Sequence, residues 1–180
     1  MRNDDEPDRV EFRRQQWTRE MPNLDTRGMA VLGRARTITL RVRPQIEAVF
    51  ARHGLDTGEF DVLSTLLRSG PPYQLRPTEL FNSLMISSGG LTARLARLQK
   101  AGLIERPEST SDGRSLPVRL TAAGLARTRT AVEEDMRLEA ELIAGLSDAE
   151  FTTLAALLRK LARALEEGEE DGKEAPGSGS

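Results

Sequence analysis

Apolar residues recur at helical spacing along most of the chain, and breaks in this pattern divide it into successive helices. A short polar helix is expected over residues 10–20, because Pro22 interrupts the pattern directly afterwards. A much longer helix is expected over residues 25–53, with a kink at Pro44 and a stop at Gly54. The chain therefore begins with two helices of very different length.

The next helix is marked by a capping signature. Asp56 and Glu59 stand three residues apart, as the two members of a capping box do, and Leu63 and Leu67 follow on one helical face. We expect this helix to end near the Gly70-Pro71-Pro72 segment, where helical backbone is disfavoured.

Two short helices with a tight link follow, which is the pattern of a helix-turn-helix. Pro77 suits the first helical position, and residues 78–84 form the first short helix. The second is expected over residues 88–101, after a link at Ile86-Ser87, and Gly102 ends it. Leucines recur on its inner face at Leu91, Leu95 and Leu98.

Two apolar segments around a polar loop then predict a β-hairpin. They cover residues 103–106 and 117–120, and the loop between them covers residues 108–115. A hairpin directly after a helix-turn-helix is typical of a winged helix, in which it forms the wing.

The C-terminal region contains two further helices. Thr121 suits the cap of a helix over residues 121–144, and Ser147 with Glu150 forms a second capping box before a helix over residues 147–167. The last helix carries a near-heptad stripe of leucines, which needs a partner helix to cover it. This stripe comprises Leu154, Leu158, Leu161 and Leu165. Residues 169–180 are acidic and rich in Gly and Ser, and we expect them to be a disordered tail.

Composition excludes several classes of protein. The 180 residues contain no Cys, which excludes thiolate catalysis, disulfides and Cys-rich zinc sites and suits a reducing cytoplasm. No apolar run is long enough for a membrane span or a signal peptide, so we expect a cytoplasmic protein without a membrane partner. A single histidine, His53, precedes the stop at Gly54, where its cationic form favours the helix dipole.

The formal net charge of −2 argues against nucleic-acid binding, but its distribution does not. Basic residues gather in the middle of the chain, at Arg76, Arg94, Arg97, Lys100, Arg106, Arg114 and Arg119. Acidic residues gather near the C-terminus, at Glu166, Glu167, Glu169, Glu170, Asp171 and Glu174.

The second helix of the helix-turn-helix suits insertion into a major groove. Small and polar residues such as Thr92, Ala96 and Lys100 form its outer face, so bulky groups do not hold the backbone away from base edges. Arg114, at the hairpin tip, suits insertion into a minor groove. The alternatives are an ordinary amphipathic surface helix and a solvated loop. The candidate DNA-binding residues are Thr78, Ser87, Ser88, Gly89, Gly90, Thr92, Arg97, Lys100, Asp112, Arg114 and Ser115.

The segments 76–80, 95–104, 112–115 and 120–124 resemble the multiple-antibiotic-resistance regulator (MarR) family of winged-helix repressors. The resemblance covers about residues 27–165. It implies a mainly α fold with a small β-hairpin wing and a homodimer formed by the N- and C-terminal helices. It also implies a pseudo-palindromic operator in double-stranded DNA and a small-molecule effector bound between the lobes. On this basis residues 1–24 are an N-terminal extension, residues 25–168 the winged-helix domain and residues 56–120 its DNA-binding lobe.

A narrower resemblance is to the urate-responsive branch of that family, the HucR and PecS type. This branch implies ligand-binding roles for Trp17, Asp61, Arg94 and Arg106. An ion pair between Asp61 and Arg94 would fix the reading helix, and a planar anion would compete for the arginines. The alternative is a purely structural salt bridge, with Trp17 packing the extra helix.

These features predict a ligand-responsive repressor and not an enzyme. The sequence assembles no catalytic constellation, phosphate-loop motif, metal site or cofactor site. Urate is the expected effector, and the alternatives are another anion, a phenolic compound, or a winged-helix module that only contacts proteins.

Overall fold

The computed structural model describes residues 6–84, 90–106 and 116–174, the last six of these as backbone only. The chain divides into two compact units, residues 1–136 and 137–180. Within the described residues no helix is both long and apolar enough to cross a membrane.

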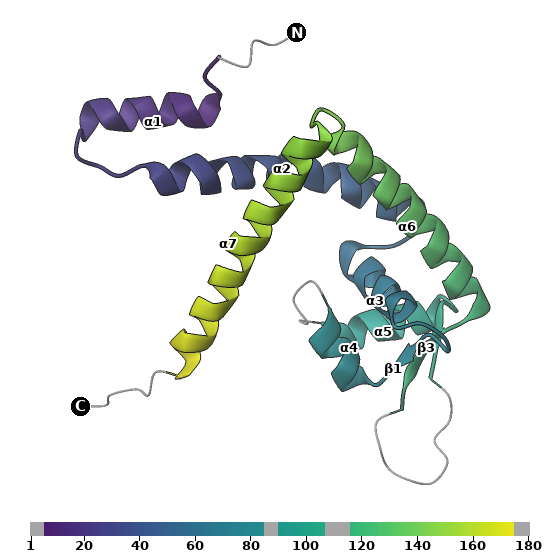
Figure 1. Ribbon diagram of the computed structural model, residues 1–180. Helices are drawn as coiled ribbons and strands as arrows, with labels where there is room; N and C mark the ends of the chain where they lie inside the picture. The colour runs from purple at the N-terminus through teal and green to yellow at the C-terminus, as the bar shows by residue number, and fades with distance from the viewer. Residues whose placement is uncertain (1–5, 85–89, 107–115, 175–180) are drawn as a thin grey trace. The chain divides into compact units, whose positions relative to one another are not determined.

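The first two helices pack together, with α1 (Arg9–Glu20) along the N-terminal part of α2 (Arg27–Arg52) (Figure 1). Asp8 caps α1 by accepting hydrogen bonds from the backbone N–H groups of Val10 (3.0 Å) and Glu11 (2.7 Å), and its carboxylate also pairs with Arg34 of α2 at 2.8 Å. The helix α2 passes through Pro44 without ending.

Helix α3 (Thr57–Arg68) begins with the capping box that the sequence predicts. The N–H of Glu59 donates to Asp56 at 2.7 Å, and the N–H of Asp56 donates to Glu59 at 3.0 Å. Val62, Leu63 and Leu66 are fully buried, so α3 forms the centre of the hydrophobic core.

The helix-turn-helix contains α4 (Pro77–Ser83) and α5 (Leu91–Lys100). Pro77 opens α4 as expected, and Leu95 and Leu98 are buried as the inner-face stripe predicts. The predicted start of the second helix at residue 88 lies outside the described residues, and Gly90 is the cap that precedes α5. Gly90 has a φ of +78°, which lies outside the right-handed helical region, so α5 begins at Leu91.

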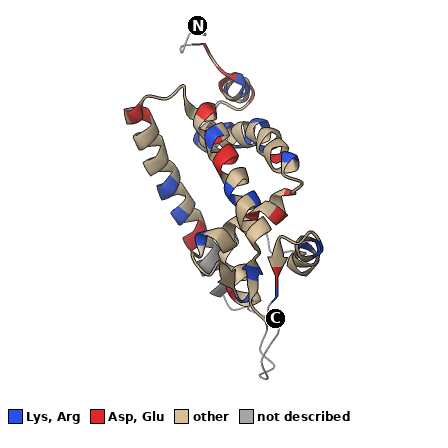
Figure 2. Ribbon diagram, turned by 90° about the vertical axis from the view of Figure 1, so that its right-hand side faces the viewer, with Lys and Arg blue, Asp and Glu red and all other residues tan. Residues whose placement is uncertain are grey.

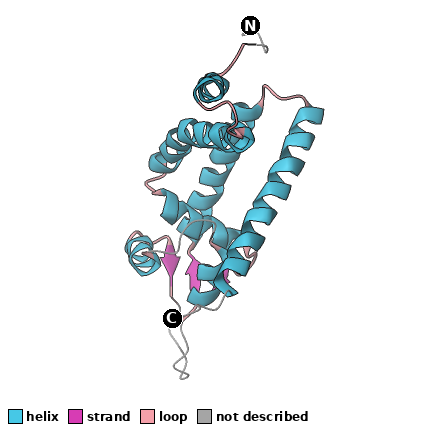
Figure 3. Cartoon of the chain, turned by 90° about the vertical axis from the view of Figure 1, so that its left-hand side faces the viewer, coloured by secondary structure: helices cyan, strands magenta, loops and turns pink. Residues whose placement is uncertain are grey.

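A small antiparallel sheet replaces the simple hairpin expected from the sequence. Its strands, magenta in Figure 3, are β1 (Gln74–Leu75), β2 (Ile104–Glu105) and β3 (Val118–Leu120). Their order in the sheet is β1-β3-β2. The hairpin strands β2 and β3 are shorter than predicted, and β1 is an additional strand that pairs with β3.

Helix α6 (Ala122–Ile143) is capped by Thr121, whose hydroxyl accepts the N–H of Gly124 at 3.0 Å. Helix α7 (Asp148–Glu174) begins with the predicted capping box, in which the N–H of Ser147 donates to Glu150 at 2.8 Å. It continues past Gly168, where we expected it to end. One glycine inside a helix costs only about 1 kcal/mol, which a long helix absorbs.

Gly124 lies so close to Leu103 that the structure leaves no space for a Cβ atom. A Cβ built there would lie 2.8 Å from the Leu103 carbonyl carbon and 3.2 Å from its Cα. The Leu103 carbonyl oxygen accepts the N–H of Thr121 at 3.1 Å, so this backbone is fixed in place.

We therefore expect Gly124→Ala to lower the free energy of unfolding by about 1–3 kcal/mol, as overpacking does. Gly28→Ala is the matched control, because a Cβ at Gly28 meets no atom within 4 Å. Chemical denaturation followed by circular dichroism measures both. Equal stability of the two variants would contradict the close packing of α6 against Leu103.

Candidate functional site

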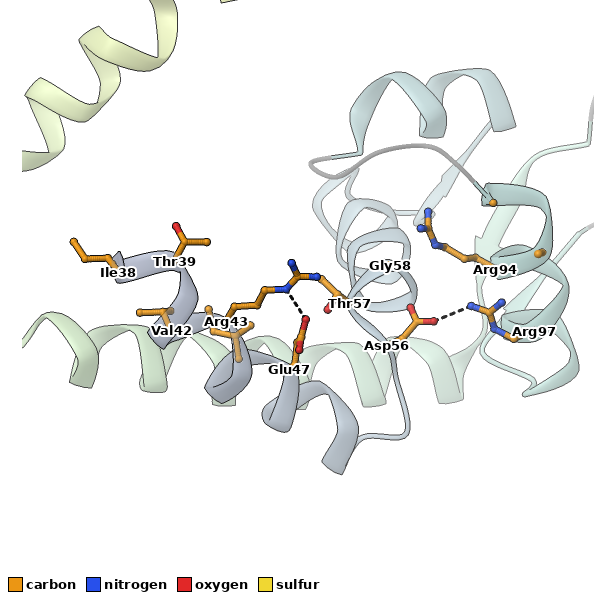
Figure 4. A pocket seen from close by; sticks show the side chains of 13 residues that line it. Ile38, Thr39, Val42, Arg43, Glu47, Asp56, Thr57, Gly58, Arg94 and Arg97 are labelled. Atoms are coloured by element: carbon orange, nitrogen blue, oxygen red, sulfur yellow. Dashed lines mark hydrogen bonds and ion pairs between the residues drawn. The ribbon is translucent and has the colours of Figure 1, made fainter. Parts of the chain in front are cut away.

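A cavity of about 920 Å³ lies between α2, α3 and α5 (Figure 4). Its apolar wall comes from Ile38, Val42 and Ile46 of α2. Its polar groups come from all three helices. They are Thr39, Arg43 and Glu47 of α2, Asp56 and Thr57 at the start of α3, and Arg94 and Arg97 of α5.

Arg94 packs on the first turn of α3. Its side chain occupies the space next to Gly58, where a Cβ would come within 2.7 Å of the guanidinium carbon and 2.9 Å of Cδ. Gly58 is buried, and Asp61, with 5% of its surface exposed, lies one helical turn further along α3. The absence of a side chain at Gly58 is therefore what lets Arg94 approach α3.

Arg97 binds both carboxylates of the α3 capping box. Its Nε lies 2.6 Å from Glu59 Oε1, and its Nη2 lies 2.8 Å from Asp56 Oδ2. The hydrogen bond to Glu59, with the charges of Glu59 and Asp56, raises the pKa of Arg97 above its ordinary value. Sequence reasoning assigned Asp56 and Glu59 to helix capping alone and missed this second role.

The third guanidinium of the cavity belongs to Arg43, whose Nε lies 2.7 Å from Glu47 one turn along α2. Figure 4 shows Arg43 extending from α2 towards Thr57, while Arg94 and Arg97 extend from α5 towards α3. The cavity thus combines an apolar wall with arginines from two sides, an arrangement suited to a small anion with an apolar body.

The four residues predicted to bind ligand do not all line this cavity. Arg94 lines it, and Asp61 lies next to its α3 wall. Trp17 lies half-exposed on α1, and Arg106 follows β2 as an exposed residue. Neither of these two lines the cavity of the single chain, so the four-residue site remains a prediction.

Part of the predicted DNA-binding set comes together at the helix-turn-helix. Thr78 of α4 and Gly90 and Thr92 at the start of α5 surround a hollow of about 480 Å³ with exposed Phe81. Lys100 is exposed at the end of α5. The remaining members Ser87, Ser88, Gly89, Asp112, Arg114 and Ser115 lie outside the described residues.

Basic and acidic residues are interspersed along the helices (Figure 2). Arg97 pairs with two carboxylates, and Arg119 of β3 pairs with Glu105 of β2 at 2.7 Å. The described residues contain no cluster of three His, Asp or Glu side chains placed to hold a metal ion.

Comparison with known proteins identifies the fold and the family. Residues 53–115 match the model of the MarR family. The chain is 38% identical over 151 residues to the HTH-type transcriptional regulator PecS of Dickeya dadantii, covering 84% of this chain and 91% of PecS. It is 32% identical over 120 residues to the HTH-type transcriptional repressor Rv2887 of Mycobacterium tuberculosis, covering 67% and 84% of the two chains.

Solved structures agree with this assignment. MarR of E. coli in its apo form is 28% identical with a TM-score of 0.58, over 72% of this chain and 96% of that protein. The complex of Mycobacterium tuberculosis Rv2887 with salicylic acid is also 28% identical with a TM-score of 0.58, over 78% and 99%. The predicted winged-helix fold is thereby confirmed, and the chain belongs to the MarR family as a DNA-binding transcriptional regulator and not an enzyme.

Proposed function

We propose that this protein is a homodimeric repressor that binds a pseudo-palindromic operator and is released by a small aromatic anion, with urate as the first candidate. The observation that carries the proposal is the cavity beside α5, whose wall is apolar and whose polar groups include Arg43, Arg94 and Arg97. A ligand there would touch the helix that reads DNA, so its binding and operator binding would be coupled.

Operator recognition is assigned to α4, α5 and the wing. In this proposal Thr92 and Lys100 face a major groove and Thr78 contacts the backbone beside it; all three residues are exposed. A homodimer carries two such reading helices, so the half-sites would lie about one helical turn apart.

The effector class follows from the chemistry of the cavity. Planar guanidinium groups bind carboxylates and similar anions through paired hydrogen bonds, and the α2 wall accepts an apolar ring. Salicylic acid, which is bound in the Rv2887 structure, is an aromatic anion of this kind. Urate is favoured here because Trp17, Asp61, Arg94 and Arg106 match the urate-responsive branch residue by residue.

The proposed switch depends on differential binding. A ligand weakens DNA binding only if it prefers a conformation that does not fit the operator. In that conformation the two α5 helices of the dimer no longer have the spacing of the two half-sites. The anion would compete with Asp61 for Arg94, the side chain that packs on Gly58. Operator DNA should weaken ligand binding by the same factor.

Dimerisation is assigned to apolar side chains on the first and last helices. Large hydrophobic residues are exposed along α2, among them Val31, Leu32 and Leu40. The α7 stripe is exposed as well, with Leu154 at 44%, Leu158 at 50% and Leu165 at 58%. Apolar surface of this extent is costly in water, and a second copy of the chain would cover it.

A different anion or a phenolic effector is the second candidate, because three arginines and an apolar wall do not define one ligand. Calorimetry with a panel that contains urate, salicylate and neutral phenols separates these ligands. A module that only contacts proteins is excluded if mobility-shift assays show binding to the DNA upstream of the gene.

Urate should weaken binding to the protein's own promoter by about 5- to 150-fold, which corresponds to a coupling of about 1–3 kcal/mol. Val42→Phe, which narrows the cavity from α2, should lower urate affinity about tenfold and leave operator affinity unchanged. Calorimetry and fluorescence anisotropy measure the two affinities. Unchanged urate affinity in this variant would show that the effector binds elsewhere.

Trp17 is the only tryptophan, so its fluorescence reports directly on the four-residue site. We expect quenching as urate is added, because the ring would stack near the indole. Arg106→Ala should bind the operator normally but lose the response to urate. Urate that releases DNA without quenching Trp17 would exclude Trp17 from the site and leave the repressor assignment intact.

Leu158→Asp should convert the dimer to monomers or aggregates, because an unpaired charge in an apolar interface is costly. Ala156→Asp adds the same charge on the opposite face of α7 and should remain dimeric. Light scattering distinguishes the two results. A stable Leu158→Asp dimer would rule out this stripe as the interface.

A further inference from the structure

The two carboxylates that cap α3 also bind α5, the helix proposed to contact DNA. Asp56 and Glu59 each accept one backbone N–H at the start of α3 with one carboxylate oxygen. Each binds the guanidinium of Arg97 with its other oxygen. We call Asp56, Glu59 and Arg97 the α3–α5 clamp. It joins residues that are 38 and 41 positions apart in the sequence.

The clamp offsets the electrostatic repulsion between the N-terminus of α3 and the arginines of α5. The N-terminus of a helix carries a partial positive charge, so arginines placed against it are disfavoured. Arg94 lies over Gly58 in the first turn of α3, and Arg97 lies beside the same turn. The carboxylates of Asp56 and Glu59 make this approach of two cations favourable.

The clamp also defines the rotation of α5 about its own axis. Arg94 and Arg97 are one turn apart on α5, so both face α3 from the same side. Arg97 uses Nε for Glu59 and Nη2 for Asp56, and a planar guanidinium meets both acceptors in only a narrow range of orientations. Rotation of α5 that turned Arg97 towards DNA would break both ion pairs and move Thr92 and Lys100.

We infer that Arg97 is a positioning residue for DNA binding: it sets the orientation of α5 through Asp56 and Glu59 and does not itself contact the operator. This differs from the role as a DNA contact that the sequence predicts for Arg97. The inference depends on DNA binding by the family and not on the effector or the dimer interface proposed above.

The test compares Arg97→Gln with Glu59→Gln in the full-length protein, using the promoter fragment and a series of KCl concentrations. Gln at position 59 can still accept the N–H of Asp56, so the capping box remains while the charge is lost. Both variants should bind about tenfold more weakly, and the double variant should bind no more weakly than Arg97→Gln alone. The slope of log K against log salt should not change in either variant.

Two controls calibrate these results. Lys100→Gln should reduce the salt slope by about 0.9, because it removes a cation assigned to the groove, where its charge also neutralises a phosphate. Glu79→Gln removes a carboxylate with the same capping role in α4, where Glu79 accepts the N–H of Arg76 at 2.8 Å. It should not weaken operator binding, in contrast to Glu59→Gln, because no described basic residue pairs with Glu79.

A salt slope reduced by about 0.9 in Arg97→Gln, or tighter DNA binding by Glu59→Gln, would overturn the inference and identify Arg97 as a DNA contact. Lower thermal stability with unchanged operator affinity would overturn it too, since the clamp would then be structural only. Asp56→Asn is the second variant if Glu59→Gln does not fold, because Asn caps helices as well as Asp. The same decrease in affinity at constant slope is expected for it.

Discussion

The first turn of α3 is the constraint on which the DNA-binding lobe depends. Its two carboxylates satisfy backbone N–H groups and bind Arg97, and its buried glycine admits Arg94. The same turn therefore fixes the start of the central core helix and the position of the reading helix. A substitution in it would affect core stability and DNA recognition together.

The cavity occupies the other side of this contact. It is lined by Asp56, Gly58, Arg94 and Arg97, and α2 completes its apolar wall. Residues that orient the reading helix thus belong to the wall of the space assigned to the effector. Coupling between such a ligand and α5 requires no long chain of contacts, because the same side chains line the cavity and orient α5.

Local features were predictable from the sequence because their causes are local. The capping boxes at Asp56 and Ser147, the cap at Thr121 and the opening proline of α4 all depend on residues within one helical turn. The strand β1 was missed because two residues carry no periodicity, and it exists only through its pairing with β3.

The candidate site was predictable only in part, for the same reason. Arg94 was identified from the family pattern, but the pairing of Arg97 with two acids about 40 positions away depends on how α5 packs against α3. Arg43 carried no signal, because an arginine and a glutamate four residues apart are common on solvated helices. Gly58 could not be recognised from the sequence either, because its role is to leave space for the side chain of Arg94.

The central position of β3 has a consequence for the helices connected to the sheet. On one edge β3 pairs with β1, which only Arg76 separates from Pro77 of α4, and its own end leads into Thr121 and α6. The sheet therefore links the helix-turn-helix to the helix that follows the wing. A substitution that displaced β3 would therefore move α4 and α6 together, because the strand pairs with the segment before one helix and continues into the other.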